Sequence, residues 1–252
     1  MMKTTLLLIG HGSRDPEGNQ EIEEFARRWR EMRPEWTIEL CFIEFADVLM
    51  EEGLARAAQQ SARVIVVPLI LNAAGHVNEE IPEAVEAARE KHPATEFILT
   101  AHLGACEPVL DILQRNLRQG MRELDFPDPR NTGLILLGRG SSDRLANGEV
   151  AKMARWLLET SDHELVDIAF TGITHPRLER VVQRQVKLGM MQIVILPYYL
   201  FTGVLIKRIR RQVERLRGQY PALRFACGEY FGFEAEIFAL LEQRIEEAGG
   251  MS

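Results

Sequence analysis

Two histidines and a glutamate directly follow apolar runs in the first half of this 252-residue sequence. His11 stands between two glycines in the segment Gly10–Asp15, Glu44 ends an apolar run, and His76 follows the small residues Ala73–Gly75. Imidazole and carboxylate ligands suit divalent cobalt, nickel, iron or zinc. A neutral imidazole can also accept a proton near neutral pH. These residues together predict a site that binds a metal ion and takes up protons.

Each of the three residues also has an ordinary structural interpretation. A single histidine at a strand end is more often a hydrogen-bonded structural residue than a ligand. Glu44 is equally consistent with a solvent-facing strand end, although a carboxylate within an apolar strand needs a partner, a proton or a metal ion. Two histidines after strands of the same half favour function, because both side chains then lie at one rim of the sheet.

Short apolar runs alternate with amphipathic stretches along the chain and predict the elements that position these residues. We expect strands at 4–9, 38–44, 64–70, 96–100, 132–137, 165–170, 192–198 and 223–227. We expect helices at 16–32, 48–61, 81–91, 107–120, 147–160, 177–188, 205–217 and 234–247. Strands rich in Val, Ile and Leu that alternate with helices predict an α/β fold, in which a parallel sheet has helices on both faces. Asp15 followed by Pro16 is typical of a helix start.

The sequence is an internal duplication with an offset of about 128 residues. Leu6–Asp15 matches Leu134–Asp143, and Ile65–Leu71 matches Val194–Leu200. We therefore expect two similar α/β domains, 1–126 and 127–252, each a parallel sheet flanked by helices. The polar, proline-rich stretch 125–131 is the predicted linker.

The second half lacks the histidine and glutamate set. The counterparts of His11, Glu44 and His76 there are Arg139, Gly172 or Ile173, and Leu205. This half instead offers hydroxyl and basic side chains near the strand ends, namely Arg139, Ser141, Ser142, Tyr198, Tyr199, Lys207 and Arg208. Residues 1–128 carry a net charge of −10 and residues 129–252 a net charge of +3, so we expect the second half to bind an anion.

We expect part of the basic run 207–217 to be a solvated helix face. The first turn of this predicted helix could bind carboxylates through its positive charge and its free backbone amides. His175 lies near Gly172 and Ile173, the candidate counterparts of Glu44, where a structural place in a helix-cap region explains it at least as well as a functional role.

Composition excludes several classes of protein. The net charge of −7 argues against a general nucleic-acid-binding protein. No apolar run approaches the roughly 20 residues of a membrane span, and we expect no secretory leader from the pattern of the first residues. Cys41, Cys106 and Cys227 form no C-x-x-C pair, so a disulfide framework or structural zinc site is not expected. We expect a cytoplasmic protein.

The glycine-rich segment Gly10–Asp15 does not fit other common motifs. Asp15 replaces the third glycine of a dinucleotide fingerprint, and the Gly-Lys-Ser/Thr of a P-loop is absent. The Gly-x-Ser-x-Gly of a nucleophile elbow is also absent.

Taken together, the motifs resemble the sirohydrochlorin chelatases of the CbiX type, in the long two-domain form of the class II tetrapyrrole chelatases. The matching segments are Gly10–Asp15, Val67–Pro68, Ala74–Val77, Gly138–Asp143 and Val194–Leu205. The resemblance covers essentially the whole chain.

This resemblance implies two similar α/β domains with a cleft between them. It also implies insertion of a divalent metal ion into sirohydrochlorin, a cyclic tetrapyrrole with eight carboxylates, in cobalamin or siroheme-type biosynthesis. His11 and His76 correspond to the active-site pair, and Glu44 corresponds to an assisting carboxylate. Metal insertion releases two protons from the pyrrole nitrogens, and the histidines would ligate the ion and act as bases. The residues expected to bind substrate are Ser13, Arg14, Arg139, Ser141, Ser142, Tyr198, Tyr199, Lys207 and Arg208.

The long form favours Co²⁺, with Fe²⁺ and Ni²⁺ as alternatives. Some long relatives carry a histidine-rich tract and a cysteine-containing cluster site near the C terminus, and residues 246–252 contain neither. We therefore expect no iron–sulfur cluster, and no cofactor beyond the metal ion that is inserted.

Two other functions remain open at the level of sequence. A tetrapyrrole or metal carrier would bind both compounds without insertion. A hydrolase dependent on His11 would need a nearby arginine, for which Arg14 is the candidate. We expect a monomer that binds a small-molecule tetrapyrrole, and neither nucleic acid nor membrane as a partner.

Overall fold

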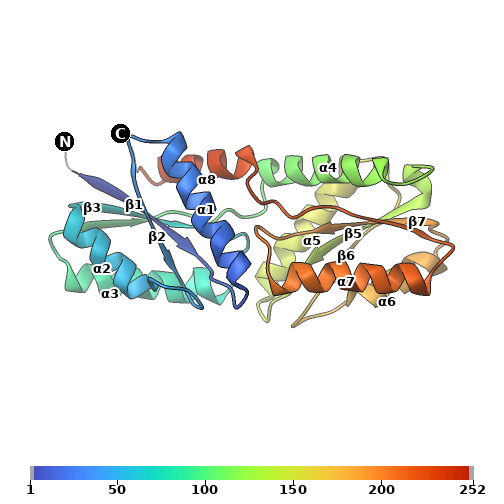
Figure 1. The fold of residues 1–252 in the computed structure, drawn as a ribbon, viewed down its shortest axis with the longest axis horizontal. Coiled ribbons are helices and arrows are strands. Elements are labelled where there is room, and N and C mark those ends of the chain that lie inside the picture. Colours follow the sequence, from blue (N-terminus) through green and yellow to red (C-terminus); the bar gives the residue numbers. More distant parts are fainter. Residues whose placement is uncertain (1–2, 250–252) are drawn as a thin grey trace. The chain divides into compact units, whose positions relative to one another are not determined.

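A computed structural model describes residues 3–249, except for the side chain of His76. The chain forms two compact units, each built on one sheet (Figure 1). Unit 1 comprises Met1–Gly104 and Phe233–Ser252, and unit 2 comprises Ala105–Gly232. Among the described residues, no helix is both long enough and apolar enough to span a membrane.

Unit 1 contains a four-stranded parallel sheet of order β2-β1-β3-β4. Its strands are β1 (Thr4–Gly10), β2 (Thr37–Phe42), β3 (Arg63–Pro68) and β4 (Glu96–Leu99). The helices α1 (Pro16–Met32) and α8 (Ala235–Glu247) lie on one face, and α2 (Met50–Gln60) and α3 (Ile81–Lys91) lie on the other. A π-helical turn, His76–Glu80, leads into α3. The side chains from Leu6 to Ile9 on the central strand β1 are fully buried, as helices on both faces require.

Unit 2 repeats this arrangement with the sheet order β6-β5-β7-β8. Its strands are β5 (Thr132–Gly138), β6 (Val166–Phe170), β7 (Gln192–Pro197) and β8 (Arg224–Cys227). The helices α4 (Glu107–Arg122) and α5 (Arg144–Glu159) cover one face, and α6 (Leu178–Lys187) and α7 (Val204–Gln219) cover the other. The short 3-10 helix Pro129–Asn131 precedes β5. The predicted fold class and internal duplication are thus confirmed.

Most predicted elements differ from the observed ones by only a few residues at their ends. One difference affects the site, because β2 ends at Phe42 and leaves Glu44 in the following loop. The desolvation argument that placed Glu44 inside an apolar strand was therefore wrong. Helix α5 begins at Arg144, three residues earlier than predicted, because the Asp143 carboxylate accepts a hydrogen bond from Leu145 N at 2.8 Å and caps the helix. Asp15 caps α1 in the same way, as expected.

The last helix of each sequence repeat packs in the unit built from the other repeat. Helix α8 belongs to unit 1, where Phe238 stacks on Phe25 of α1 with ring centroids 4.0 Å apart. Helix α4 belongs to unit 2, where it contacts β7, β8 and α5. The two repeats therefore exchange their terminal helices, and the predicted division at 126/127 does not coincide with the compact units.

The predicted linker 125–131 lies within unit 2 and is tied to it. Thr132 Oγ1 donates to Asp128 O at 2.7 Å, and Gln192 Nε2 donates to Phe126 O at 2.6 Å. The chain instead passes between the units after Gly104 and again after Gly232.

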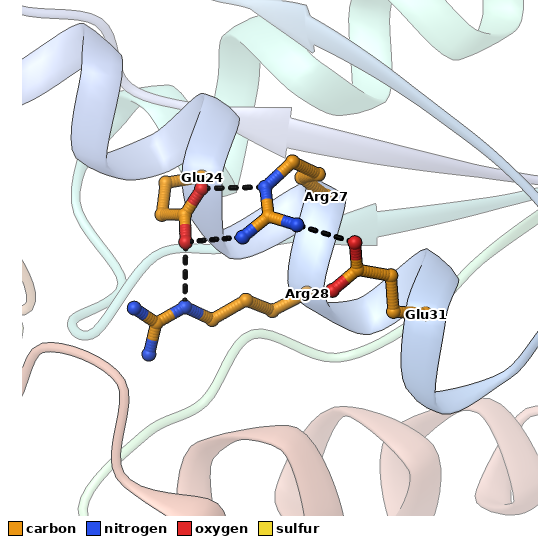
Figure 2. A network of polar contacts seen from close by, with 4 residues as sticks. All are labelled: Glu24, Arg27, Arg28 and Glu31. Atoms are coloured by element: carbon orange, nitrogen blue, oxygen red, sulfur yellow. Dashed lines mark hydrogen bonds and ion pairs between the residues drawn. The ribbon is translucent and has the colours of Figure 1, made fainter.

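A network of charged side chains lies on the outer surface of α1 (Figure 2). Glu24 accepts hydrogen bonds from Arg27 and Arg28, each at 2.7 Å, and Arg27 also donates to Glu31. These hydrogen bonds lower the pKa of Glu24 to about 2. The Arg28 guanidinium also lies 4.2 Å from the ring centroid of Phe233, the residue with which the chain re-enters unit 1. Such exposed ion pairs contribute little stability.

Candidate functional site

The loops that follow β1 and β2 run side by side beyond the carboxyl edge of the sheet. Ile43 N donates to Gly10 O at 3.0 Å, and Glu44 N donates to His11 O at 3.2 Å. Gly12 has a φ of +85°, and a Cβ atom there would lie 1.6 Å from Glu44 O. Only glycine allows the two backbones to approach this closely, and the approach brings His11 beside Glu44.

His11 and Glu44 form the described part of the predicted metal and proton site. His11 Nδ1 lies 3.8 Å from Glu44 Oε1, and the two side chains are 28% and 38% exposed. Both are therefore accessible to a ligand. His11 Nδ1 also lies 3.0 Å from Gly12 O. Because a carbonyl oxygen only accepts, this contact places the hydrogen on Nδ1 and the lone pair of the neutral ring on Nε2.

His76 begins the π-helical turn that precedes α3, in the segment after β3. Its backbone therefore follows the strand adjacent to β1, as the sequence predicts. The position of its side chain lies outside the described residues. Among the described side chains, no group of three His, Cys, Asp or Glu residues is arranged to hold a metal ion. The three-residue site thus stays a prediction.

The loops after β5 and β6 of unit 2 repeat the backbone arrangement of the His11 and Glu44 loops, but they carry different side chains. Gly140 has a φ of +86°, and Gly172 N donates to Arg139 O at 2.9 Å, as Glu44 N does to His11 O. This pairing identifies Gly172, and not Ile173, as the counterpart of Glu44. The equivalent edge of unit 2 consequently carries a guanidinium in place of the imidazole and a glycine in place of the glutamate.

Tyr199, Arg139 and Arg208 lie near one another at the carboxyl edge of unit 2. The Tyr199 hydroxyl hydrogen-bonds to Thr171 Oγ1 at 2.7 Å. Burial raises the pKa of Tyr199, and it outweighs the hydrogen bond from Thr171 and the positive charges of the two arginines, all of which lower it. The hydroxyl therefore stays protonated beside two exposed cations, an arrangement suited to binding carboxylates.

Tyr198 does not join this group. Its side chain is 3% exposed, and its ring contacts Phe231 edge-on at 5.5 Å. Its hydroxyl is buried with no hydrogen-bond partner among the described residues, and burial raises its pKa. Successive residues near a strand point to opposite faces, so Tyr199 reaches the edge while Tyr198 enters the core. The structure thus places Tyr198 in the core of unit 2, and contact between Tyr198 and substrate stays a prediction.

Several other predicted substrate-binding residues already have structural contacts. Ser13 Oγ and Ser141 Oγ accept hydrogen bonds at 3.0 Å from the amides of Asp15 and Asp143. These bonds order the turns that lead into α1 and α5, while each hydroxyl hydrogen can still be donated elsewhere. The Arg14 guanidinium lies 4.8 Å from the ring centroid of Phe45.

Two further predicted residues belong to unit 2: Ser142 is exposed, and Lys207 is half-buried in the first turn of α7. His175, whose role the sequence left open, is also exposed.

The sequence interpretation missed two asparagines that organise these loops. Asn19 hydrogen-bonds to the backbone of Ser13, and Asn147 hydrogen-bonds to the backbone of Ser141. The two asparagines are 128 residues apart, the same offset that relates Leu6–Asp15 to Leu134–Asp143. Extending the repeat by four residues on the C-terminal side would have identified both of them.

Comparison with known proteins agrees with the repeated fold and with the two loop motifs. The CbiX family model matches residues 5–120 and again residues 133–248. The chain belongs to the CbiX family. Both matches include the glycine-containing loops that carry His11 and Arg139, so the family resemblance extends over the two repeats.

Family members of known name are similar over nearly the full chain. A sirohydrochlorin cobaltochelatase of Priestia megaterium is 38% identical over 248 residues, which cover 96% of this chain and 79% of that protein. A sirohydrochlorin ferrochelatase of Bacillus subtilis is 28% identical over 252 residues, which cover 100% of this chain and 94% of that protein.

Two solved structures are also similar to this chain over nearly its full length. The structure of SirB from Bacillus subtilis with Fe³⁺ superposes with a TM-score of 0.82 at 27% identity, covering 98% of this chain and 96% of that one. SirB from Bacillus subtilis subspecies spizizenii in complex with cobalt gives a TM-score of 0.80 at 25% identity, covering 98% of this chain and 95% of that one.

Proposed function

We propose that this CbiX-family chain is a sirohydrochlorin chelatase, which inserts a divalent metal ion into the macrocycle and releases two protons. The observation that carries the proposal is the His11–Glu44 pair, held 3.8 Å apart by adjacent loops at the carboxyl edge of unit 1. The similarity to relatives named as sirohydrochlorin chelatases supports the same reaction.

His11 has the chemistry for metal delivery and for proton uptake. With Nδ1–H directed at Gly12 O, the Nε2 lone pair is the one that can bind the incoming ion. Once the ion moves into the macrocycle, the same lone pair can accept a pyrrole proton, because imidazole titrates near neutral pH. His76 is proposed as the second ligand and base.

Glu44 would act on the ion. Its carboxylate, 3.8 Å from His11 Nδ1, adds a negative oxygen ligand for a divalent ion beside the imidazole. The metal ion is a substrate here, and the proposed reaction needs no redox or nucleotide cofactor.

The carboxyl edge of unit 2 is proposed to bind carboxylates of the macrocycle. Arg139 and Arg208 supply positive charge, Tyr199 supplies a neutral hydroxyl donor, and Lys207 lies in the first turn of α7. Ser141 and Ser142 precede α5, where a helix N-terminus also favours anions. Ser13 and Arg14 occupy the corresponding turn in unit 1.

Co²⁺ is the proposed physiological metal. The support is the 38% identity to a cobaltochelatase, against 28% to the ferrochelatase of Bacillus subtilis. Because imidazole and carboxylate ligands accept Fe²⁺ and Ni²⁺ as well, metal preference is a separate measurement. We also propose that the chain acts as a monomer, since both repeats reside in it.

The test is the absorbance change of sirohydrochlorin under anaerobic conditions with Co²⁺, Fe²⁺ and Ni²⁺ in turn. We expect the protein to accelerate insertion over the protein-free rate, fastest with Co²⁺. His11→Ala and His76→Ala should each reduce the rate about 100-fold or more, the typical contribution of a positioned acid–base group.

Other outcomes would point to other functions. A protein that binds sirohydrochlorin and metal without acceleration would be a carrier, and the enzyme proposal would be overturned. A protein that binds neither compound would leave a hydrolase dependent on His11 as the interpretation to test.

A further inference from the structure

The side chain of Asn19 connects the two loops that carry His11 and Glu44. Asn19 lies in the first turn of α1, and its Oδ1 accepts a hydrogen bond from Ser13 N at 2.7 Å. Its Nδ2 donates to Ser13 O at 3.0 Å and to Phe45 O at 2.9 Å. One amide group thus uses its oxygen and both of its hydrogens, and all three bonds go to backbone atoms.

These bonds fix the backbone immediately beside both functional side chains. Ser13 lies two residues after His11, and Phe45 directly follows Glu44. Phe45 has a φ of 57°, a left-handed conformation that is unfavourable for a bulky residue. Ile173, the equivalent residue of unit 2, has a φ of 61°, and no bond of this kind from Asn147 is found among the described residues. We therefore assign the bond from Asn19 to Phe45 O to the placement of the Glu44 loop and not to this backbone conformation. Helix α1 provides a rigid base, because Ile22 and Phe25 anchor it in the core.

Comparison with unit 2 separates the two asparagine bonds that the repeats share from the one that is found beside Glu44. Asn147 repeats the two bonds to Ser141, accepting from its N at 2.9 Å and donating to its O at 2.8 Å. Within the described residues, Asn147 makes no third bond to the loop that follows β6. That loop carries Gly172 where unit 1 carries Glu44. Both units have the backbone bond between the two loops, but among the described residues the additional bond from the asparagine to the second loop is found only in unit 1, which has the carboxylate.

We propose that Asn19 is a positioning residue, which holds the loops that carry His11 and Glu44 together so that both side chains can bind one divalent metal ion. The bond to Phe45 O holds the Glu44 loop against the His11 loop, and the two bonds to Ser13 hold the His11 loop against α1. This proposal rests on the proposed function for its catalytic consequence, but its direct test is metal binding by the protein alone.

The test is a titration of the protein with Co²⁺, followed by the visible absorption of bound cobalt in the absence of sirohydrochlorin. We expect Asn19→Ala to weaken Co²⁺ binding about 10–100-fold, the usual effect of removing a partner that orients metal ligands. Asn19→Asp retains the size of the side chain and one acceptor oxygen but loses both donors. It should weaken binding to a similar extent.

Asn147→Ala is the matched control, because it removes the two shared bonds in unit 2 and no bond between loops. We expect it to leave Co²⁺ affinity unchanged, even if its melting temperature falls as far as that of Asn19→Ala. Equal Co²⁺ affinity for wild type and both Asn19 variants, measured well below the melting temperatures, would overturn the proposal. Equal weakening by Asn147→Ala would also overturn it.

A double-mutant cycle tests the route through Glu44. In a Glu44→Ala background, Asn19→Ala should weaken Co²⁺ binding less than it does in wild type, because the carboxylate that it helps to place is gone. An undiminished effect would show that Asn19 does not act through Glu44. In the insertion assay, a wild type without activity would refute the proposed chelatase. An active wild type with fully active Asn19 variants would refute only the role of Asn19.

Discussion

At the scale of single residues, the site depends on close approach between backbones. His11 and Glu44 do not reach each other across a sheet; they lie on consecutive loops joined by the bond from Glu44 N to His11 O. The glycine at position 12 is the residue without which those loops collide. Gly12 has no side chain of its own, yet it determines how closely the side chains of His11 and Glu44 approach each other.

Gly12→Ala should disrupt the site. The added Cβ would meet Glu44 O at 1.6 Å at a backbone φ of +85°, so the loops must separate. We expect a loss of about 2–4 kcal/mol in the free energy of unfolding, in the range of strained or overpacked substitutions. Metal insertion should fall about 100-fold, the cost of a displacement of about 1 Å between catalytic groups.

Gly148→Ala is the control for that substitution. Gly148 lies within α5, and a Cβ there meets no atom within 4 Å. We expect urea unfolding to show a gain of about 0.5–1 kcal/mol from improved helix propensity, with insertion unchanged. A Gly12→Ala variant with wild-type insertion would contradict the proposed geometry.

The burial of His163 predicts that the free energy of unfolding depends on pH. The residue is 7% exposed, both ring nitrogens are buried without hydrogen-bond partners among the described residues, and burial lowers its pKa below the ordinary 6.5. The nearby charge of Asp162 only partly offsets this effect. The folded state therefore binds fewer protons than the unfolded state. The free energy of unfolding therefore has its full value above about pH 6.5. It decreases as the pH falls below 6.5 through the lowered pKa of His163 in the folded state.

Urea unfolding at pH 5.5 and 7.5 would measure this dependence. We expect His163→Leu to be less sensitive to acid over this interval than wild type. An identical pH dependence in wild type and variant would contradict the assignment to His163.

At the scale of elements, α8 is attached to α1 by both aromatic and ionic contacts. Phe238 stacks on Phe25, and the Glu242 carboxylate accepts hydrogen bonds from Arg33 Nε at 2.8 Å and from Trp29 Nε1 at 3.3 Å. The hydrogen bond from Arg33 lowers the pKa of Glu242, and the bond from Trp29 adds to the effect. A helix from the end of the sequence thereby completes the cover of the first sheet.

Glu242→Ala should loosen this attachment. Because Glu242 is largely buried while Arg33 is partly exposed, we expect a loss of about 1–2 kcal/mol, allowing for solvent screening of the arginine. Chemical denaturation would measure it. The control is Glu214→Ala, which removes an exposed ion pair with Arg217 on α7 and should change stability by less than about 0.5 kcal/mol. Equal effects of the two substitutions would contradict an anchoring role for Glu242.

At the scale of the whole molecule, neither sequence repeat contains a complete compact unit. Residues 1–126 include α4, which packs in unit 2, and residues 127–252 include α8, which packs in unit 1. When expressed alone, each repeat would lack one of the two helices that cover one face of its sheet. Its own last helix, α4 or α8, would have no sheet to pack against.

Separated repeats should therefore fold only together. We expect fragments 1–126 and 127–252 to be aggregated or poorly folded when expressed singly, and to form a one-to-one complex when co-expressed. Size-exclusion chromatography with light scattering would measure the complex. The fragment 105–232 is the control, because it contains unit 2 in full and should unfold cooperatively by itself. A cooperatively folded monomer of residues 1–126 would contradict this prediction.

Much of this architecture follows from the order of residues alone. Buried strands such as Leu6–Ile9 and helix starts such as Asp15–Pro16 depend on local patterns, which act within a few residues of the chain. The positions of His11 and Glu44 near strand ends follow from the same patterns, because all strands of a parallel sheet end at one edge. The duplication is visible in the sequence because Leu6–Asp15 recurs as Leu134–Asp143 with the same order of strand and helix patterns around it.

Three features depended on tertiary structure. The exchange of α4 and α8 could not be predicted from periodicity, because a repeated fold offers each amphipathic helix two equivalent sheets. Tyr198 is buried and Tyr199 only partly buried, and this difference depends on how the segment after β7 packs against the rest of unit 2. The bond from Asn19 to Phe45 O joins residues 26 positions apart, so only the packing of α1 against the loop after β2 brings them together. The sequence by itself therefore determined which residue types reach the edge of each sheet. The tertiary structure decided which of them meet, because those contacts join chain segments that local patterns do not relate.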